Sequence, residues 1–288
     1  MESYGILVDN GIISPMGLMK ALKLPPPLGL DEVITLGNKG IEIIEHLMRY
    51  STNAERKDAT ISIEEVTILP PVPSPPKIIC LGLNYRDHAK EQNTETSDEP
   101  VIFMKPRTAV IGSEQPIIRP SFVKQLDYEA ELAIVIGKKG KDIAASDAKD
   151  YIFGYTVFND VSARDIQFKD KQWTRGKSFD TFAPMGPCIT TATQIKNPNN
   201  LHICTRVNGE QRQNSSTNNM VLNVYEIVRY LSVVMTLEPG DIIATGTPAG
   251  VGVFMKPEPK FLSPGDLVEI EIEGIGTLRN KVVESKAG

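Results

Sequence analysis

The sequence predicts a mainly β protein with helices, in which a small N-terminal α+β domain precedes a larger domain. Short apolar runs with the length and β-rich composition of strands recur along the chain from residue 77 onward. Five prolines fall between residues 70 and 76, a composition typical of a stiff extended connector. We therefore expect a domain at 1–69, a linker at 70–76 and a larger domain at 77–288.

The N-terminal segment combines strand and helix patterns. The Asn10-Gly11 pair lies between two apolar stretches and predicts a tight hairpin. Apolar residues at helical spacing, namely Ile41, Ile44, Leu47 and Met48, predict a helix. The segments 61–63 and 68–69 are predicted to be further strand.

The larger domain opens with a predicted buried strand at 77–83, followed by a candidate catalytic segment. If residues 86–91 are helical, His88 and Glu91 share a face because they are three residues apart. A carboxylate next to an imidazole raises its basicity and fixes its tautomer, as a general base requires. The alternative is an ordinary surface pair. The polar stretch from Glu91 to Pro100 is predicted to be a lid over a cleft.

Two carboxylates lie within the predicted strand 127–136. Glu129 and Glu131 are two residues apart, so their side chains would point to the same face. The apolar residues around them fall on both faces, which is typical of a strand covered on both sides. Neighbouring buried carboxylates repel each other, so they require a cation or a proton.

A third carboxylate follows the next predicted strand, at 151–158. Asp160 comes directly after it, and residues 161–169 are predicted to form a short helix. Three carboxylates without a nearby His or Cys make an oxygen site suited to Mg²⁺, Mn²⁺ or Ca²⁺. The alternative is an exposed strand face with Asp160 as a helix cap. Arg164 and Lys177 are either charge compensation or ligands for an anionic substrate.

The rest of the chain is predicted to add two strand pairs, a helix and a glycine-rich loop. The helix begins after Asn223, and a hairpin is centred on Asn208-Gly209. Residues 267–283 form the closing strand pair. The loop 246–252 follows a strand and lacks a nucleotide-binding pattern, so its N–H groups and the Thr247 hydroxyl are candidates for holding a carboxylate.

The composition limits the classes of partner and the cellular compartment that we expect for this protein. The chain is 41% hydrophobic and 23% charged, as in ordinary globular proteins. Its net charge of -5 and pI near 5.4 argue against nucleic acid or an anionic membrane as partner, and favour a small substrate. Three dispersed cysteines fit a reducing compartment. Neither a signal-peptide pattern nor an apolar run of roughly 18 residues is present, so we expect a cytoplasmic protein.

Taken together, the motifs of the larger domain resemble the fumarylacetoacetate hydrolase family, from Lys77 to the C-terminus. The resemblance is closest to short-form members with a small N-terminal domain. It rests on these segments in chain order: Asn84-Tyr85-x-x-His88-x-x-Glu91, Phe103-Met104-Lys105-Pro106, Tyr128-Glu129-x-Glu131, Asn159-Asp160-x-x-x-Arg164-x-x-Gln167, Gly176-Lys177-Ser178 and Gly246-Thr247-Pro248-Ala249-Gly250-Val251-Gly252.

The resemblance implies a mixed β-sandwich or β-roll catalytic domain, in a homodimer, and assigns roles to nine residues. The metal ligands would be Glu129, Glu131 and Asp160, and the ion Mg²⁺ or Mn²⁺. The catalytic groups would be His88, Glu91 and Lys177. The groups that hold a small carboxylated substrate would be Arg164, Gln167 and Thr247.

The resemblance also implies an activity. We expect a metal-dependent hydrolase that cleaves a C–C bond of an acylpyruvate such as fumarylpyruvate, in aromatic catabolism. Alternatives that use the same site are an oxaloacetate decarboxylase and a 2-hydroxy-dienedioate isomerase. A non-catalytic ligand-binding protein is a remote alternative. The longer hydrolases of the family carry an extra acidic ligand shortly before the dyad histidine, whereas residues 81–84 here contain no carboxylate, which argues against fumarylacetoacetate as substrate and against Ca²⁺.

Overall fold

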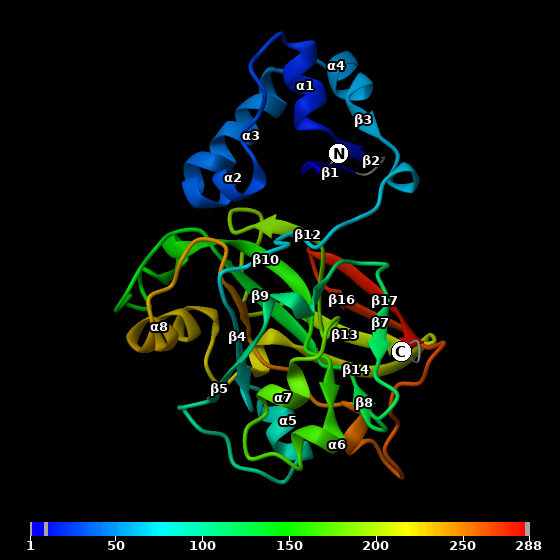
Figure 1. Ribbon diagram of the computed structural model, residues 1–288. Helices are drawn as coiled ribbons and strands as arrows, with labels where there is room; N and C mark the ends of the chain where they lie inside the picture. Colours follow the sequence, from blue (N-terminus) through cyan, green and yellow to red (C-terminus); the bar gives the residue numbers. More distant parts are fainter. Residues whose placement is uncertain (1, 9–10, 286–288) are drawn as a thin grey trace. The chain divides into compact units, whose positions relative to one another are not determined.

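The computed structural model describes residues 2–8 and 11–285 (Figure 1). Contacts between Cα atoms divide the chain into two compact units, Met1–Ile68 and Leu69–Gly288. The described residues contain no helix that is both long enough and apolar enough to cross a membrane. All the residues assigned to a candidate site belong to the second unit.

The first unit is a small α+β structure. Its sheet has the order β1-β2-β3, and its strands are β1 (Ile6–Val8), β2 (Gly11–Ile13) and β3 (Thr60–Ile61). Its helices are α1 (Pro15–Ala21), α2 (Leu30–Leu36), α3 (Asn38–Tyr50), α4 (Asn53–Asp58) and the 3-10 helix η1 (Ile63–Glu65). Ile13, Leu18 and Ala59 form one small buried cluster in it.

The structure of this unit agrees with one predicted feature and corrects another. The antiparallel pairing of β1 with β2 agrees with the predicted hairpin, although its turn residue Asn10 lies outside the described residues. The strand predicted over 61–63 and 68–69 is wrong beyond Ile61. The Ser62 hydroxyl accepts a hydrogen bond from the Glu64 N–H at 3.4 Å, and this local contact starts the 3-10 helix η1 instead.

The second unit is built on two main sheets. The seven-stranded sheet has the order β5-β4-β15-β9-β10-β12-β6. Its strands are β4 (Ile78–Gly82), β5 (Val101–Lys105), β6 (Val110–Ile111), β9 (Ala130–Ile136), β10 (Ile152–Asn159), β12 (Ala183–Thr191) and β15 (Ile242–Ala244). The five-stranded sheet has the order β14-β13-β16-β17-β7, with β7 (Ile117–Arg119), β13 (His202–Val207), β14 (Glu210–Ser216), β16 (Leu267–Ile272) and β17 (Gly276–Glu284).

Shorter elements complete this unit. A two-stranded ribbon joins β8 (Leu126–Asp127) to β11 (Ser162–Ala163). The helices are α5 (Arg86–Glu91), α6 (Arg164–Gln167), α7 (Thr174–Lys177) and α8 (Val224–Val234), and the 3-10 helices are η2 (Arg107–Ala109), η3 (Ala148–Tyr151), η4 (Thr217–Asn219) and η5 (Gly252–Phe254). Figure 1 shows α5, α6 and α7 near one another at one end of the unit. Strands dominate, so the predicted mainly β fold with helices is confirmed.

The strand β9 lies inside the larger sheet, between β15 and β10. Every one of its residues is buried, and Leu132, Ile134 and Ile136 belong to the main hydrophobic core. A strand flanked on both edges and covered on both faces has little freedom to move. The prediction of a doubly covered strand is therefore confirmed, and its N-terminal end makes a rigid support for side chains.

The helix predicted over 161–169 is much shorter than expected. Ser162 and Ala163 pair with Asp127 and Leu126 as the β11–β8 ribbon, so helical structure begins only at Arg164. Asp160 is consequently not a helix cap, because the residue before this helix is Ala163. Long-range strand pairing has overridden the local helical pattern here.

The other local predictions for this unit agree with the structure. Asn208 and Gly209 have φ values of +52° and +80° in the turn between β13 and β14, the left-handed conformation that tight hairpins require. The Asn223 side chain accepts hydrogen bonds from the N–H groups of Tyr225 and Glu226 at the start of α8. The closing strand pair is β16 with β17.

Candidate active site

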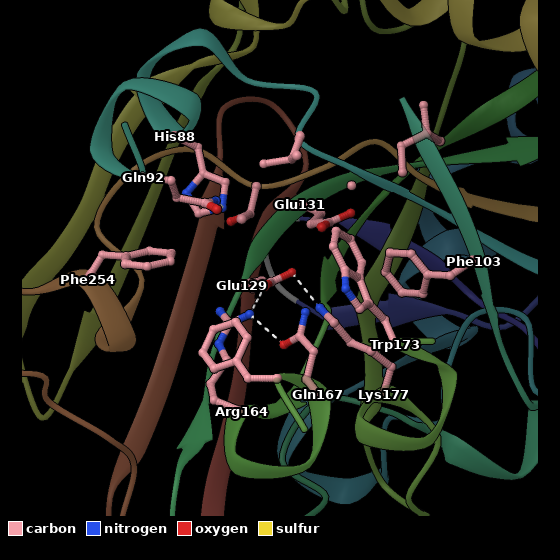
Figure 2. Close-up of a pocket in the computed structure, with 15 residues that line it drawn as sticks. His88, Gln92, Phe103, Glu129, Glu131, Arg164, Gln167, Trp173, Lys177 and Phe254 are labelled. Carbon is pink, nitrogen blue, oxygen red and sulfur yellow. Dashed lines mark hydrogen bonds and ion pairs between the residues drawn. The ribbon is translucent and has the colours of Figure 1, made fainter. Parts of the chain in front are cut away.

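One pocket in the second unit gathers most of the residues that the sequence singled out (Figure 2). Its empty space amounts to about 470 Å³, a volume that includes open solvent at its mouth. The predicted residues that line it are His88, Glu129, Glu131, Arg164, Gln167, Lys177 and Thr247. The other two, Glu91 and Asp160, contact lining residues from behind.

The three carboxylates meet at the end of strands β9 and β10. Glu131 is on β9, Glu129 directly precedes it, and Asp160 directly follows β10. Their exposed fractions are 1%, 6% and 0%, and each offers an oxygen such that all three oxygens lie within 4.8 Å of one another. The alternative of an exposed strand face is therefore wrong. The cluster has the composition of a site for a hard divalent cation.

Cations surround two of these carboxylates. Lys177 Nζ lies 2.8 Å from both Glu129 Oε2 and Asp160 Oδ2. Arg164 Nη1 lies 2.7 Å from Glu129 Oε1, as the dashed lines in Figure 2 indicate. Burial by itself raises the pKa of Glu129, but the charges of Lys177 and Arg164 outweigh it and lower this pKa to about 2. Glu129 is thus an anion at neutral pH.

Glu131 has a different environment. Its Oε2 accepts a hydrogen bond from the Gly246 N–H at 2.8 Å, and no Lys or Arg among the described residues forms an ion pair with it. Burial, together with the charges of Asp160 and Glu129, raises its pKa well above the ordinary value. One carboxylate of the three therefore lacks a positive partner within the protein. A divalent cation bound among the three oxygens would supply it, so the donor set fits a metal.

A buried lysine that the sequence analysis left without a role supports this cluster. Lys105, at the end of β5, forms an ion pair with Asp160, and its Nζ donates to the Lys177 and Val161 carbonyls at 2.6 and 3.1 Å. Burial lowers its pKa, and the charge of Lys177 acts in the same direction. Lys105 occurs in the Phe103–Pro106 motif, which was the only sequence signal for it. It fixes Asp160 and the backbone of Lys177 relative to each other.

His88 and Glu91 form the predicted dyad on α5. His88 Nδ1 lies 3.1 Å from Glu91 Oε2, and the other carboxylate oxygen accepts from the Gly250 N–H at 2.9 Å. His88 is only 6% exposed, so the alternative of a surface pair is wrong. Because Nδ1 donates to a carboxylate, a neutral His88 ring carries its lone pair on Nε2.

The Nε2 atom of His88 faces a residue that sequence reasoning did not single out. Gln92 Nε2 lies 2.6 Å from it, and both residues line the pocket. Figure 2 shows the two side chains next to each other across the pocket from Lys177. The lone pair on His88 Nε2 accepts from the Gln92 amide N–H. A substrate group or a water that gives its proton to His88 would have to occupy the position of that N–H.

Arg164, which lines the pocket, has one side-chain donor without a partner among the described residues. Its Nε donates to Asp127 Oδ2 at 2.9 Å and its Nη1 to Gln167 Oε1 at 3.0 Å, whereas its buried Nη2 has no hydrogen-bond partner within the described part of the chain. Asp127 also accepts from the N–H groups of Gly252 and Val253, at 2.8 and 3.1 Å. Arg164 is therefore held rigidly while one donor stays available for an anion.

Aromatic side chains form another wall of the pocket. Trp173 packs edge-on against Phe103, with ring centroids 5.6 Å apart, and Phe254 lies near His88 at 6.0 Å (Figure 2). A Cβ on Gly82 would lie 2.3 Å from the Trp173 ring, so only glycine at that position lets the ring lie there. The pocket is thus lined by charged side chains, namely Glu129, Glu131, Arg164 and Lys177, together with aromatic side chains.

Comparison with known proteins settles the family. Residues 77–283 match the family described as fumarylacetoacetate (FAA) hydrolase C-terminal. This chain belongs to that family. The predicted resemblance is confirmed, and the related structures below confirm the fold class that it implied.

Individual relatives within the family are described by different reactions. A mitochondrial oxaloacetate tautomerase of Bos taurus is 52% identical over 221 residues, which are 76% of this chain and 70% of the relative. The crystal structure of a 2-hydroxyhepta-2,4-diene-1,7-dioate isomerase from Mycobacterium marinum is 44% identical, with a TM-score of 0.69, covering 79% of this chain and 82% of that one. A fumarylacetoacetate hydrolase from Exiguobacterium antarcticum is 41% identical, with a TM-score of 0.75 over 89% and 88% of the two chains.

Proposed function

We propose that this protein is a Mg²⁺- or Mn²⁺-dependent tautomerase that interconverts the keto and enol forms of a 2-oxo acid such as oxaloacetate. The observation that carries the proposal is the placement of an oriented imidazole, His88, opposite Lys177 and three buried carboxylates in one small pocket. Proton transfer next to a carbonyl needs a base at the carbon and positive charge at the oxygen. The identity to the bovine oxaloacetate tautomerase supports this substrate class.

Polar and charged side chains that line the pocket provide the groups that bind the substrate. Arg164 Nη2 and the Thr247 hydroxyl are available to hold the 1-carboxylate. Lys177 stays protonated although it is buried, because Asp160 and Glu129 raise its pKa against the opposing effect of burial. Its ammonium group stabilises negative charge that develops on the 2-oxo oxygen. A metal ion held by Glu129, Glu131 and Asp160 would supply Lewis acidity at the same oxygen.

His88 moves the proton. In the forward direction, its Nε2 lone pair takes a proton from C3, the C3–H electrons form the C2–C3 double bond, and the C2–O double bond becomes single. The Nε2–H of the protonated ring then gives a proton to the 2-oxo oxygen, which completes the enol and restores the neutral imidazole. Glu91 holds the ring in the required tautomer and stabilises the positive charge on the ring between the two transfers. In the substrate-free protein, the Gln92 amide is hydrogen-bonded to His88 Nε2. This hydrogen bond must break when substrate binds, so that Nε2 can accept the proton from C3.

Hydrolysis of an acylpyruvate is the second candidate, and the same dyad favours it. His88 oriented by Glu91 is the arrangement needed to deprotonate a water for attack on a carbonyl. The identity to the hydrolase from Exiguobacterium antarcticum supports it as well. The two reactions share the metal, Lys177 and the carboxylate-binding groups. They differ in whether His88 acts on carbon or on water.

A side-by-side assay separates these reactions. Metal-stripped protein is supplied with Mg²⁺ or Mn²⁺ and tested on enol-oxaloacetate, oxaloacetate, fumarylpyruvate and a simple acylpyruvate. We expect metal-dependent equilibration of enol with keto oxaloacetate, without release of pyruvate or CO₂. Cleavage of the acylpyruvates without tautomerisation would replace the proposal with the hydrolase, and loss of CO₂ from oxaloacetate would replace it with the decarboxylase.

His88→Ala tests the role of the base. We expect tautomerisation to slow by about 10²- to 10⁴-fold, because a positioned general base contributes that much to a rate. The matched control is His202→Ala, an exposed histidine on β13 whose Nε2 contacts Asn214. That variant should keep the wild-type rate. Full activity of His88→Ala would contradict the mechanism.

The oligomer and the nature of the substrate remain part of the proposal. The homodimer implied by the family resemblance stays a prediction, which light scattering of the purified chain would test. The positive groups of the pocket support a small carboxylated substrate. Binding of pyruvate to the metal-loaded protein, measured by calorimetry, would test that part without relying on turnover.

A further inference from the structure

We infer that Gln213, a buried residue of β14, is a positioning residue that holds the Thr247 hydroxyl as an acceptor and so keeps its hydrogen for the substrate carboxylate. Gln213 is fully buried and lies on a different sheet from the metal-site strands. Neither the sequence patterns nor the family resemblance indicated it. The inference rests on the proposed function, because it concerns how the carboxylate of a 2-oxo acid is held.

The orientation of the Gln213 amide is fixed at its oxygen end. The Ala130 N–H lies 3.0 Å from Gln213 Oε1, and the Thr205 hydroxyl lies 2.8 Å from the same atom. A backbone N–H only donates, so the amide atom facing Ala130 must be the oxygen. The NH₂ group therefore points the other way, toward the glycine-rich loop.

The nitrogen end confirms this orientation and decides the role of Thr247. Gln213 Nε2 lies 2.9 Å from the Pro248 carbonyl oxygen, which only accepts, and 2.8 Å from Thr247 Oγ1. The two amide hydrogens are thus used by one acceptor each. Thr247 Oγ1 receives one of them, so its own hydrogen must point elsewhere.

The pocket is where that hydrogen can find an acceptor. Thr247 lines the pocket, and among the described residues its hydroxyl has no partner besides Gln213. Gln213 occupies one lone pair of the hydroxyl and leaves its hydrogen unused, so that hydrogen can be donated to an anion that binds there. An anion gains from this arrangement, because a hydroxyl free to rotate would have to be reoriented at the moment of binding.

The same amide links the two parts of the site. Ala130, its backbone partner, lies between Glu129 and Glu131, and Thr247 belongs to the loop after β15. That loop rests directly on β14, since a Cβ on Gly250, which has φ of +103°, would lie 2.1 Å from the Arg212 carbonyl oxygen. Gln213 thus sets the distance between the carboxylate cluster and the carboxylate-binding hydroxyl.

A double-mutant cycle on pyruvate binding tests the inference. Pyruvate is titrated into the Mg²⁺-loaded protein by calorimetry, and unfolding is followed separately as a measure of folding. We expect Thr247→Val to weaken binding about 10-fold or more, the effect of losing a hydrogen bond to a charged group. Gln213→Glu keeps an acceptor for Ala130 but offers Thr247 an acceptor in place of a donor, so it should weaken binding about 10-fold as well.

The decisive result is the double variant. If Gln213 acts through Thr247, then Gln213→Glu added to Thr247→Val should weaken pyruvate binding less than threefold further. A merely structural role would lower affinity by the same factor in both backgrounds, and that outcome would overturn the inference. Gln211→Glu, an exposed change on the same strand, is the matched control for added charge and should bind as wild type does.

Two further outcomes keep the test informative. If Gln213→Glu does not fold, Gln213→Met takes its place in the cycle, because it removes the donor to Thr247 without adding charge. Failure of the wild-type protein to bind pyruvate with Mg²⁺ would overturn the proposed function together with the inference. Normal wild-type binding with an additive cycle would overturn the inference alone.

Discussion

The two halves of the pocket are built in different ways. The carboxylate half is on β9 and at the adjoining ends of β9 and β10, two strands in the interior of a seven-stranded sheet, and every residue of both strands is buried. The base half is on α5, a helix of six residues followed by a largely exposed stretch over residues 93–99. Side chains hold α5 in place: Asp87 Oδ2 accepts from the Ser215 hydroxyl at 2.5 Å, and Glu91 accepts from the Gly250 N–H.

This contrast indicates that the two halves of the pocket need different rigidity. The three carboxylates repel one another, and this repulsion would push a flexible backbone apart. A sheet covered on both faces is stiff enough to hold them close together. A base that must release Gln92 and meet a substrate benefits from a smaller, more weakly held element. Substitutions in the strand half should therefore abolish function, whereas loosening the helix half should only reduce it.

The largest expected effect tests the strand half. Glu131→Gln should lower metal-dependent turnover by at least about 10³-fold, because one of three charged ligands is lost. The metal-free protein should nevertheless be about 1 kcal/mol more stable to unfolding, since burial without a cation disfavours the charged Glu131 and glutamine keeps the acceptor for Gly246.

Glu129→Gln is the matched control for that result. It removes a similar carboxylate, but one that pairs with both Lys177 and Arg164. We expect the same loss of turnover together with a loss of about 3 kcal/mol in stability, because two buried cations lose a partner. Equal destabilisation by both substitutions, measured by urea unfolding in chelator, would contradict the assigned difference between the two glutamates.

Metal removal gives the next largest effect. Adding Mg²⁺ or Mn²⁺ to metal-free protein should raise its thermal stability, by about 2.7 kcal/mol when the ion is at 100 times its dissociation constant. The ion should give Glu131→Gln a much smaller increase. Calorimetric melting of both proteins with and without chelator provides the measurement. An equal increase in both would show that the ion binds elsewhere.

The smallest expected effect sharpens the description of the helix half. Ser215→Ala removes the hydroxyl that donates to Asp87, and should cost about 1 kcal/mol or less of local stability. We expect faster amide exchange in residues 86–92 and a several-fold lower turnover, with an unchanged response of the melting temperature to Mg²⁺. Ser146→Ala, at an exposed serine, is the control. A loss of metal binding in Ser215→Ala would contradict the independence of the two halves.

Spacing rules applied to the sequence identified the site residues whose partners lie two or three positions away in the same strand or helix. The spacing of two in a strand brought Glu129 and Glu131 together, and the spacing of three in a helix brought His88 to Glu91. The sequence named Arg164 and Lys177 with two possible roles, the motif resemblance assigned both to the site, and the structure places them beside the carboxylates. The two spacing relations each lie within one strand or one helix, so a local pattern contains them.

Tertiary structure alone decided the rest. Lys105 reaches a carboxylate 55 residues further along the chain, the Gln213 amide joins β9 to a loop from another part of the unit, and Arg164 is oriented by Asp127 across a short strand pair. The same strand pair replaced the first turn of the predicted helix after Asp160. Each of these contacts depends on which segments the fold brings together. A hydrogen bond or an ion pair between distant segments leaves no period in the sequence, so its members look like ordinary polar residues until the chain is folded.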